Sequence, residues 1–259
     1  MQYRYAPERS YEDLAAGRVL LHRGGMPCFP VRAGSEILSR CLAVCPKQRG
    51  LTLYDPCCGG GYLLTALGFL YPGVLGRIIG SDVSPQALSL ARDNLALLTP
   101  EGRARRREQL REMAARFGKD SHRGALESLA RLEAAAPCPP PETRLFTADL
   151  LGPAPLAGAG FTADILLADV PYGRMTAWAG GVPEPGGGDG GEACQEPPLT
   201  RFLRAVRPAC GRGTVLAVIA DKGQKLSGGG LAYLDKFTIG KRRVSIFRFK
   251  DGKEEDLVC

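Results

Sequence analysis

The stretch LTLYDPCCGGGYLLTALG, residues 51–68, decides the fold. It opens with a short apolar strand pattern that ends on Asp55, and three glycines, Gly59 to Gly61, lead into an apolar helical pattern near Tyr62. Glycine lets the backbone approach a ligand closely, and the first N–H groups of a helix are free to bind one. The stretch therefore predicts a strand, a ligand-binding turn and a helix.

The alternation of short apolar strands and helical patterns continues to about residue 220. Such alternation is typical of a mostly parallel sheet with helices on both faces, which binds its ligands outside the carboxyl ends of the strands. Aspartate also ends strands as a turn or helix-capping residue, and we favour that interpretation for Asp221. Five predicted strands each end on an aspartate: 51–55, 77–82, 143–149, 163–169 and 214–221.

Three segments depart from this alternation. Residues 101–136 carry apolar residues at helical spacing and predict a helical hairpin broken around 118–124. Residues 179–197 are rich in Gly and Pro and predict a flexible loop. Residues 236–250 alternate basic with apolar residues, as an antiparallel hairpin at a sheet edge does. We expect an N-terminal extension, residues 1–50, packed on an α/β domain, residues 51–259.

Composition narrows the class of protein. The 259 residues carry a formal net charge of +7, which favours a polyanionic partner. Nine cysteines without CxxC pairs predict neither a disulfide framework nor a metal site, and we expect Cys41 and Cys45 to share one helix face. The polar amino terminus and the lack of any run of about 18 apolar residues predict a cytoplasmic protein with no membrane partner.

The glycine turn carries a first resemblance. The pattern D-x-x-x-G-x-G, formed by Asp55, Gly59 and Gly61, resembles the first motif of S-adenosylmethionine-dependent methyltransferases. A nicotinamide dehydrogenase would prefer a further glycine where this chain has Leu64. Catalytic thiols at Cys57 and Cys58 are another interpretation, since a helix N-terminus can lower a thiol pKa. Methyl transfer to nitrogen needs no thiol nucleophile, and we therefore favour the methyltransferase.

This resemblance implies a cofactor site for S-adenosylmethionine. Asp55 would lie near the methionine amino group, Asp82 would hold the ribose, and Asp149 would accept a hydrogen bond from the adenine amine. The complete set of cofactor-binding residues that we predict is Asp55, Cys57, Gly59, Gly60, Gly61, Tyr62, Asp82, Val83, Asp149, Asp169 and Arg32.

The end of the fourth predicted strand, DVPYG at residues 169–173, resembles a motif of methyltransferases that act on base nitrogens. Asp169 can accept a hydrogen bond from an N–H and draw off developing positive charge. Pro171 restricts the turn, and Tyr172 offers a flat face on which a base can stack. The competing interpretation is that Pro171 and Gly173 only end the strand while Tyr172 fills the core. We predict that Asp169, Pro171 and Tyr172 are catalytic.

Two basic clusters favour a nucleic acid as the methyl acceptor, because each phosphate that a cation neutralises releases counterions. The first lies in the predicted helical hairpin and the second in the predicted C-terminal strands. The competing interpretations are a solvated helix face and a charged edge strand that discourages aggregation. The predicted RNA-binding residues are Arg105, Arg106, Arg107, Arg111, Arg116 and Lys119, then Trp178, then Lys241, Arg242 and Arg243.

Longer stretches make the resemblance specific. PCFPVRAGSEILSR (27–40), LYDPCCGGGYLLTALG (53–68), IIGSDVSPQALSLARDNLALLTPEG (78–102), RFGK (116–119) and DVPYGRMTAW (169–178) resemble the AviRa family of avilamycin-resistance rRNA methyltransferases. The family implies a Rossmann-like class I methyltransferase fold. It has a mostly parallel seven-stranded sheet, an antiparallel C-terminal hairpin, an N-terminal helical extension and an inserted helical hairpin.

The family further implies methylation of a guanine ring nitrogen, N1, in large-subunit 23S rRNA, with resistance to an orthosomycin such as avilamycin. The stretch FPVR would lie over the cofactor, with Arg32 and Glu36 near the site. We expect a monomer that acts on large-subunit rRNA or the ribosomal subunit. The glycine-rich loop after Trp178 is longer than in that family.

Three alternatives stay open at this point. An adenine N6 methyltransferase of RNA or DNA is one, because Asp-x-Pro-Tyr accepts either amine. A non-catalytic RNA-binding or ribosome assembly factor would keep the fold and the basic surface without cofactor affinity. A nicotinamide oxidoreductase is disfavoured by Leu64.

Overall fold

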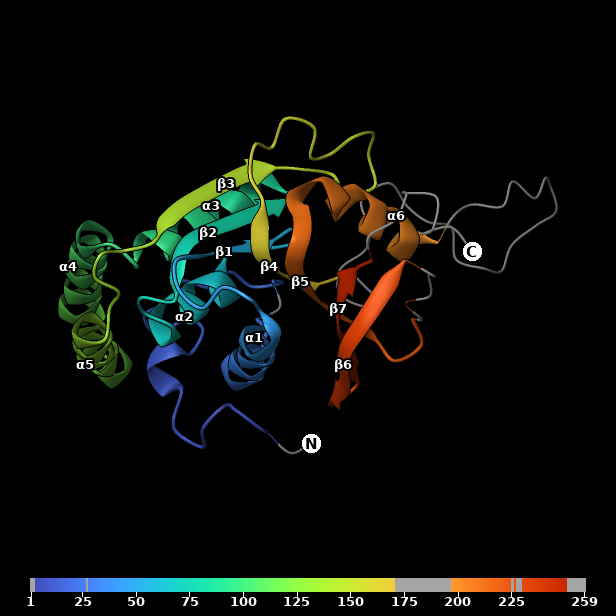
Figure 1. The fold of residues 1–259 in the computed structure, drawn as a ribbon. Coiled ribbons are helices and arrows are strands. Elements are labelled where there is room, and N and C mark those ends of the chain that lie inside the picture. Colours follow the sequence, from blue (N-terminus) through green and yellow to red (C-terminus); the bar gives the residue numbers. More distant parts are fainter. Residues whose placement is uncertain (1–2, 27, 171–196, 225, 227–229, 251–259) are drawn as a thin grey trace.

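The computed structural model describes residues 3–26, 28–170, 197–224, 226 and 230–250. In these ranges the chain forms one seven-stranded sheet with helices on both faces (Figure 1). The strands are β1 (Leu51–Asp55), β2 (Leu75–Asp82), β3 (Glu142–Thr147), β4 (Ala163–Asp169), β5 (Cys210–Asp221), β6 (Leu231–Ile239) and β7 (Arg242–Phe249). The helices are α1 (Val31–Val44), α2 (Tyr62–Leu70), α3 (Pro85–Ala96), α4 (Pro100–Phe117), α5 (Asp120–Ala134) and α6 (Pro198–Val206), with short 3-10 helices η1 (Glu12–Leu14) and η2 (Arg207–Ala209).

The strand order is β3-β2-β1-β4-β5-β7-β6. Strands β1 to β5 pair in parallel, while β7 pairs antiparallel with both β5 and β6. The predicted mostly parallel sheet with an antiparallel C-terminal hairpin is therefore confirmed. The chain order reverses between β1 and β4, which is the position at which open α/β sheets bind ligands. Asp55 ends β1 and Asp169 ends β4, so both lie at that position.

Alternation of side chains along the strands divides the core into two layers. In β4, Ile165 and Leu167 belong to the first layer, while Leu166 and Ala168 belong to the second. Helices α1, α2 and α3 contribute apolar side chains to the first layer, and α6 contributes to the second. The sheet is thus buried on both faces, as the apolar strand patterns predict.

Helices α4 and α5 form the predicted helical hairpin. Thr99 caps the start of α4 by accepting a hydrogen bond from the Gly102 N–H, and Pro100 occupies the first turn. Gly118 ends α4 in the left-handed conformation, with φ 62°, and α5 begins two residues later. The pair lies at one end of the molecule, and the β6–β7 hairpin lies at the opposite end (Figure 1). Among the described helices, none is both long and apolar enough to cross a membrane.

The predicted strand boundaries are wrong at three places. Strand β2 begins at Leu75 and β5 at Cys210, so both start earlier than the apolar runs indicate. Strand β3 ends at Thr147 instead of Asp149. The carboxylate of Asp149 accepts a hydrogen bond from the Leu151 N–H, at 3.0 Å, and this turn directs the chain away from the sheet.

Candidate active site

The glycine turn between β1 and α2 has the conformation that the sequence predicts. Gly61 precedes α2 in the left-handed region, with φ 69°, and a Cβ at this position would lie 2.9 Å from the Cα of Ala91 in α3. Glycine is therefore required for helices α2 and α3 to pack this closely. Gly59 has φ 52°, but a Cβ there would contact nothing within 4 Å. The backbone at Gly59 thus borders open space.

Asp82, at the end of β2, fixes this turn. One carboxylate oxygen accepts a hydrogen bond from the Gly59 N–H at 2.8 Å, and the other accepts from the Ser84 N–H at 2.9 Å. Asp82 therefore joins the β1 turn to the start of α3. Each carboxylate oxygen has a second lone pair, and the group can still accept hydrogen bonds from ligand hydroxyls. Val83, the next residue, is exposed.

Asp55 is a buried carboxylate, with 5% of its surface exposed. Its Oδ1 accepts a hydrogen bond from the Cys57 N–H at 3.0 Å. Burial raises the pKa of Asp55 to about 8, and the charges of Asp169 and Asp82 act in the same direction. Within the described ranges, no lysine or arginine forms an ion pair with Asp55. The ends of β1, β2 and β4 therefore bring three carboxylates together, and Asp55 has no cationic partner among the described residues.

Asp169 has a different neighbour. Its Oδ1 lies 3.8 Å from Nε of Arg242, at the start of β7. The guanidinium of Arg242 in turn lies 5.3 Å from the ring centre of Phe29. Oδ1 of Asp169 is buried and accepts no hydrogen bond from any described residue. Burial raises the pKa of Asp169 to about 6, and Arg242 opposes that rise.

The predicted FPVR stretch reaches the site through Phe29, which contacts Arg242. Arg32 lies at the start of α1, where its guanidinium is 4.2 Å from the ring centre of Tyr3. Glu36 is fully buried and accepts hydrogen bonds from the backbone N–H groups of residues 4–6. Glu36 therefore holds the N-terminal segment against α1. The assignment of Arg32 to the cofactor stays a prediction.

The two cysteines of the turn are packed, and burial raises the pKa of both thiols well above its ordinary value. Cys58 lies against β2, since a Cβ on Gly80 would come within 2.8 Å of its sulfur. Neighbouring carboxylates disfavour the thiolates further. A reactive cysteine requires the thiolate, and these positions disfavour catalysis by thiols.

Asp149, Asp221 and Tyr62 each form a hydrogen bond within the protein. Asp149 is exposed and forms the turn after β3. Asp221 accepts a hydrogen bond from the Gly223 N–H, at 2.9 Å, which confirms the turn role that we favoured. The hydroxyl of Tyr62 donates to the backbone oxygen of Leu14, at 2.7 Å. Pro171, Tyr172 and Trp178 lie outside the described residues, as does the loop 179–196.

The first basic cluster requires a correction. Arg106 is 7% exposed, and its guanidinium donates hydrogen bonds to the backbone oxygens of Val19 and Arg18, at 2.9 and 3.3 Å. Arg107 is paired with Glu133 on α5. Arg106 therefore connects α4 to the N-terminal segment, and we remove it from the predicted RNA-binding set. Sequence reasoning missed this role because a basic residue within an amphipathic helix gives no sign of a buried partner.

The family model described as the rRNA methyltransferase AviRa matches residues 1–242. The chain belongs to the AviRa family of rRNA methyltransferases. A relative from Streptomyces viridochromogenes, named 23S rRNA (guanine(2535)-N(1))-methyltransferase, is 39% identical over 259 residues and covers 96% of both chains.

Two solved structures agree with this placement in the AviRa family. Structures of the rRNA methyltransferase AviRa from Streptomyces viridochromogenes, at 2.4 and 1.5 Å, both align with a TM-score of 0.80. Their sequence identities are 37% and 36%, over 100% and 99% of this chain and 98% of each of theirs. The class I methyltransferase fold predicted from the sequence is confirmed.

Proposed function

We propose that this chain transfers a methyl group from S-adenosylmethionine to N1 of a guanine in 23S rRNA. The observation that carries the proposal is the buried Oδ1 of Asp169, which accepts no hydrogen bond from any described residue and lies 3.8 Å from Nε of Arg242. A buried acceptor without a donor is costly in a folded protein, and such an atom at a strand end of this fold fits a substrate N–H. The name of the 39% identical relative supports guanine N1 in 23S rRNA.

The residues at the ends of β1 and β2 fit the cofactor. Asp55 is a buried acid without a cationic partner among the described residues, and the ammonium group of the methionine moiety would supply one. The free lone pairs of Asp82 would accept the ribose hydroxyls, and the open space at Gly59 admits a ligand against the backbone. Asp149 would contact the adenine. When bound, S-adenosylmethionine supplies an electrophilic methyl group on a sulfonium.

Guanine N1 carries a proton that must leave when N1 gains a methyl group. The carboxylate of Asp169 would accept a hydrogen bond from this N–H and take the proton, which leaves the N1 electron pair for the methyl carbon. The sulfur would keep the electron pair of the carbon–sulfur bond that breaks. The positive charge of Arg242 favours the ionised form of Asp169, which is the form that can accept a proton. Tyr172 would stack on the base.

The rRNA and the consequence of its modification are part of the same proposal. A large-subunit rRNA, naked or in the ribosomal subunit, is the partner that the net charge of +7 and the family both support. A methyl group on N1 removes a hydrogen-bond donor from the base edge. We propose that this loss weakens the binding of an orthosomycin such as avilamycin to the ribosome.

The role of Asp169 is tested by Asp169→Asn, which keeps the shape of the side chain and removes its basicity. We expect methyl transfer to 23S rRNA to fall about 100-fold or more, because general-base catalysis contributes on that order. Calorimetry with S-adenosylmethionine, followed by transfer assays at saturating cofactor, separates a loss of cofactor binding from a loss of the transfer step. Asp221→Asn is the matched control, since Asp221 ends the neighbouring strand and its Oδ1 accepts a hydrogen bond from the Gly223 N–H. Full transfer by Asp169→Asn would overturn the proposal.

A further inference from the structure

The two basic regions of this protein differ in how many of their cations are available. Residues 100–134, which form α4 and α5, contain nine basic and six acidic residues. Arg103 and Arg106 are buried, and both donate hydrogen bonds to backbone oxygens. Further arginines of this hairpin form ion pairs: Arg107 with Glu133, Arg111 with Glu108, Arg123 with Asp120 and Arg131 with Asp13.

The cations that remain on the helical hairpin are balanced by acids. Arg105, Arg116 and Lys119 are exposed and have no ion pair to a described residue. Three acids of the same two helices likewise form no ion pair with a described residue: Glu101, Glu112 and Glu127. The helical hairpin therefore presents no excess of available positive charge, and it is a weak surface for phosphates.

The β6–β7 hairpin has the opposite balance. Residues 231–250 contain six basic residues and one acid, Asp235. Asp235 forms an ion pair with Arg40 of α1, at 2.8 Å, so its charge is already compensated. Within the described ranges, Lys236, Lys241 and Arg243 form no ion pair. This hairpin therefore carries most of the available positive charge of the two regions.

One face of the hairpin combines these cations with an aromatic ring. A bulge at Leu234 inserts one residue into β6, so that Tyr233 and Lys236 lie on the same face, with Lys236 Nζ 5.9 Å from the Tyr233 ring centre. Tyr233 is 45% exposed, and its hydroxyl donates to the backbone oxygen of Leu226 at 2.9 Å. The ring is thus held in place while its surface stays open to solvent.

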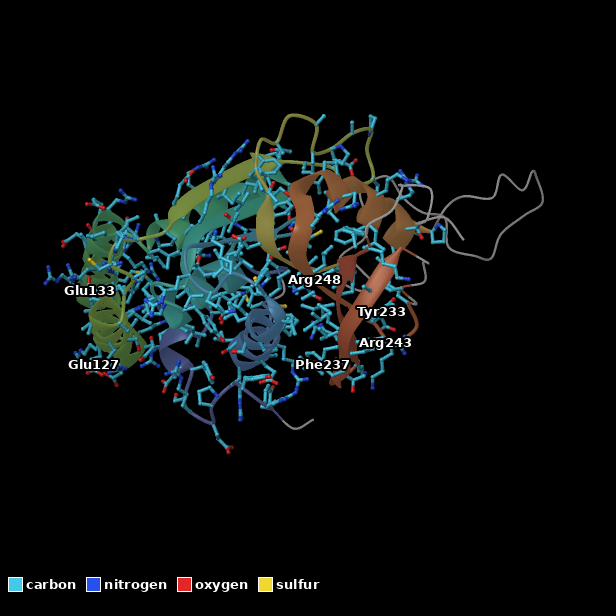
Figure 2. All side chains as sticks on the ribbon, viewed as in Figure 1. Glu127, Glu133, Tyr233, Phe237, Arg243 and Arg248 are labelled. Atoms are coloured by element: carbon cyan, nitrogen blue, oxygen red, sulfur yellow. The ribbon has the colours of Figure 1, made fainter. Side chains whose placement is uncertain are left out.

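Arg243 of β7 lies on that same face. Its neighbours Val244 and Ile246 belong to the first core layer and Phe247, which contacts the Tyr233 ring, belongs to the second. Strand alternation therefore directs Arg243 to the side of Tyr233. Figure 2 shows Tyr233 and Arg243 on this hairpin, and Glu127 and Glu133 on α5 at the other end of the molecule.

The hairpin is also continuous with the candidate active site. Arg242 immediately precedes Arg243 and forms the ion pair with Asp169. Successive side chains of a strand point to opposite faces. At the start of β7, Arg242 therefore lies on the side of Asp169, and Arg243 lies on the opposite side. No comparable connection links α4 or α5 to Asp169 in the described structure.

We propose that Tyr233, Lys236, Lys241 and Arg243, the hairpin patch, form the main RNA-docking surface of this protein. This inference rests on the proposed function, which makes RNA the substrate. The cations would neutralise phosphates, and Tyr233 would stack on an unpaired base, a combination that suits single-stranded RNA. The helical hairpin has a structural role instead.

The charge component is tested with two triple variants that each remove three cations. One is Lys236→Ala with Lys241→Ala and Arg243→Ala, and its matched control is Arg105→Ala with Arg116→Ala and Lys119→Ala. Filter binding of a 23S rRNA transcript is measured between about 50 and 200 mM salt. We expect the patch variant to bind about tenfold more weakly or worse, with a salt slope smaller by about two to three. The control should change affinity less than about threefold, because its cations are balanced by acids.

The aromatic component is tested by Tyr233→Ala against Tyr233→Phe. Loss of one stacked base predicts at least about fivefold weaker RNA binding for Tyr233→Ala, while Tyr233→Phe binds as the parent does. Unchanged affinity for S-adenosylmethionine shows that each variant is folded. In a series of RNA concentrations, the patch variants should have a higher KM for RNA and the same kcat as the parent protein.

The outcomes separate this inference from the proposed function. If the parent protein methylates 23S rRNA but the control triple loses RNA affinity while the patch triple keeps it, the inference is wrong and the function stands. If the parent protein neither binds nor methylates 23S rRNA, the proposed function fails. Equal losses in both triples also overturn the inference, because docking would then depend on total charge.

Discussion

Asp169 and Arg242 come from strands β4 and β7, which do not pair with each other. Strand β5 lies between them, with Ile219 in register with Asp169 and Asp221 in register with Arg242. The two side chains therefore meet across the end of β5. Burial raises the pKa of Asp169, and the neighbouring guanidinium opposes that rise.

This pair predicts a pH dependence of the chemical step. Asp169 accepts a proton only when it is ionised, so the single-turnover rate of methyl transfer should rise with pH and level off above an inflection at about 6. Arg242→Gln removes a cation that lowers the pKa of Asp169, and its inflection should move to higher pH. Arg242→Lys keeps the charge and should keep the inflection near that of the parent protein.

Rates measured from pH 5 to pH 9 at saturating RNA and cofactor check this expectation. An inflection that is the same in the parent, Arg242→Gln and Arg242→Lys would show that Arg242 does not act on Asp169. The residue would then belong to the RNA-binding set in which the sequence alone places it. Sequence patterns could not reveal the pair, because it depends on strand register across three strands.

Among the helices, α4 and α5 hold residues 13–19 of the N-terminal segment against the rest of the domain. Arg106 donates to Val19 and Arg18, Arg18 donates to Ser128 at 2.6 Å, and Arg131 is paired with Asp13. These contacts run from both helices of the hairpin to residues 13–19. The hairpin is therefore a support for the segment that precedes α1.

Arg106→Ala should lower the free energy of unfolding by about 2 kcal/mol, because it leaves the buried carbonyl of Val19 and the part-buried carbonyl of Arg18 without this donor. Arg105→Ala, one residue away on the exposed face, should change it by less than about 0.5 kcal/mol. Urea denaturation compares the two, and RNA affinity should be unaffected by either substitution. Weaker RNA binding by Arg106→Ala, with unchanged stability, would restore its predicted role in RNA binding.

Local sequence predicts most of the helices and strands, but it predicts fewer of the residues at which they begin and end. The predicted break at 118–124 contains Gly118, which ends α4, because a helix end depends on residues within a few positions of it. The end of β3 was predicted two residues late, since Asp149 forms a turn where the pattern indicated a strand. Strand pairing with a neighbour decides such ends, and pairing is not visible in one sequence.

At the scale of the whole molecule, the strand order brings Asp55, Asp82 and Asp169 together. The sequence predicts each of these acids at a strand end, and parallel pairing then places them at one edge. The difference in their partners separates their roles. Asp82 holds the backbone of the glycine turn, Asp55 has no cationic partner among the described residues, and Asp169 has Arg242.

The division of positive charge is also a property of the whole molecule. The sequence gives no sign that the two basic clusters differ, yet the fold buries or pairs most cations of the helical hairpin. Within the described ranges, Lys236, Lys241 and Arg243 of the β6–β7 hairpin form no ion pair. Long-range partners such as Asp13 and Val19 decide this difference.

The identity of the methylated nucleoside distinguishes guanine N1 methylation from adenine N6 methylation and from RNA binding without catalysis. 23S rRNA is incubated with the purified protein and S-adenosylmethionine, digested to nucleosides and analysed by mass spectrometry against authentic standards, with Asp169→Asn as the control. We expect 1-methylguanosine that depends on the parent protein and is lost with Asp169→Asn. N6-methyladenosine without 1-methylguanosine, or no methylated nucleoside from a protein that binds the cofactor, would contradict this expectation.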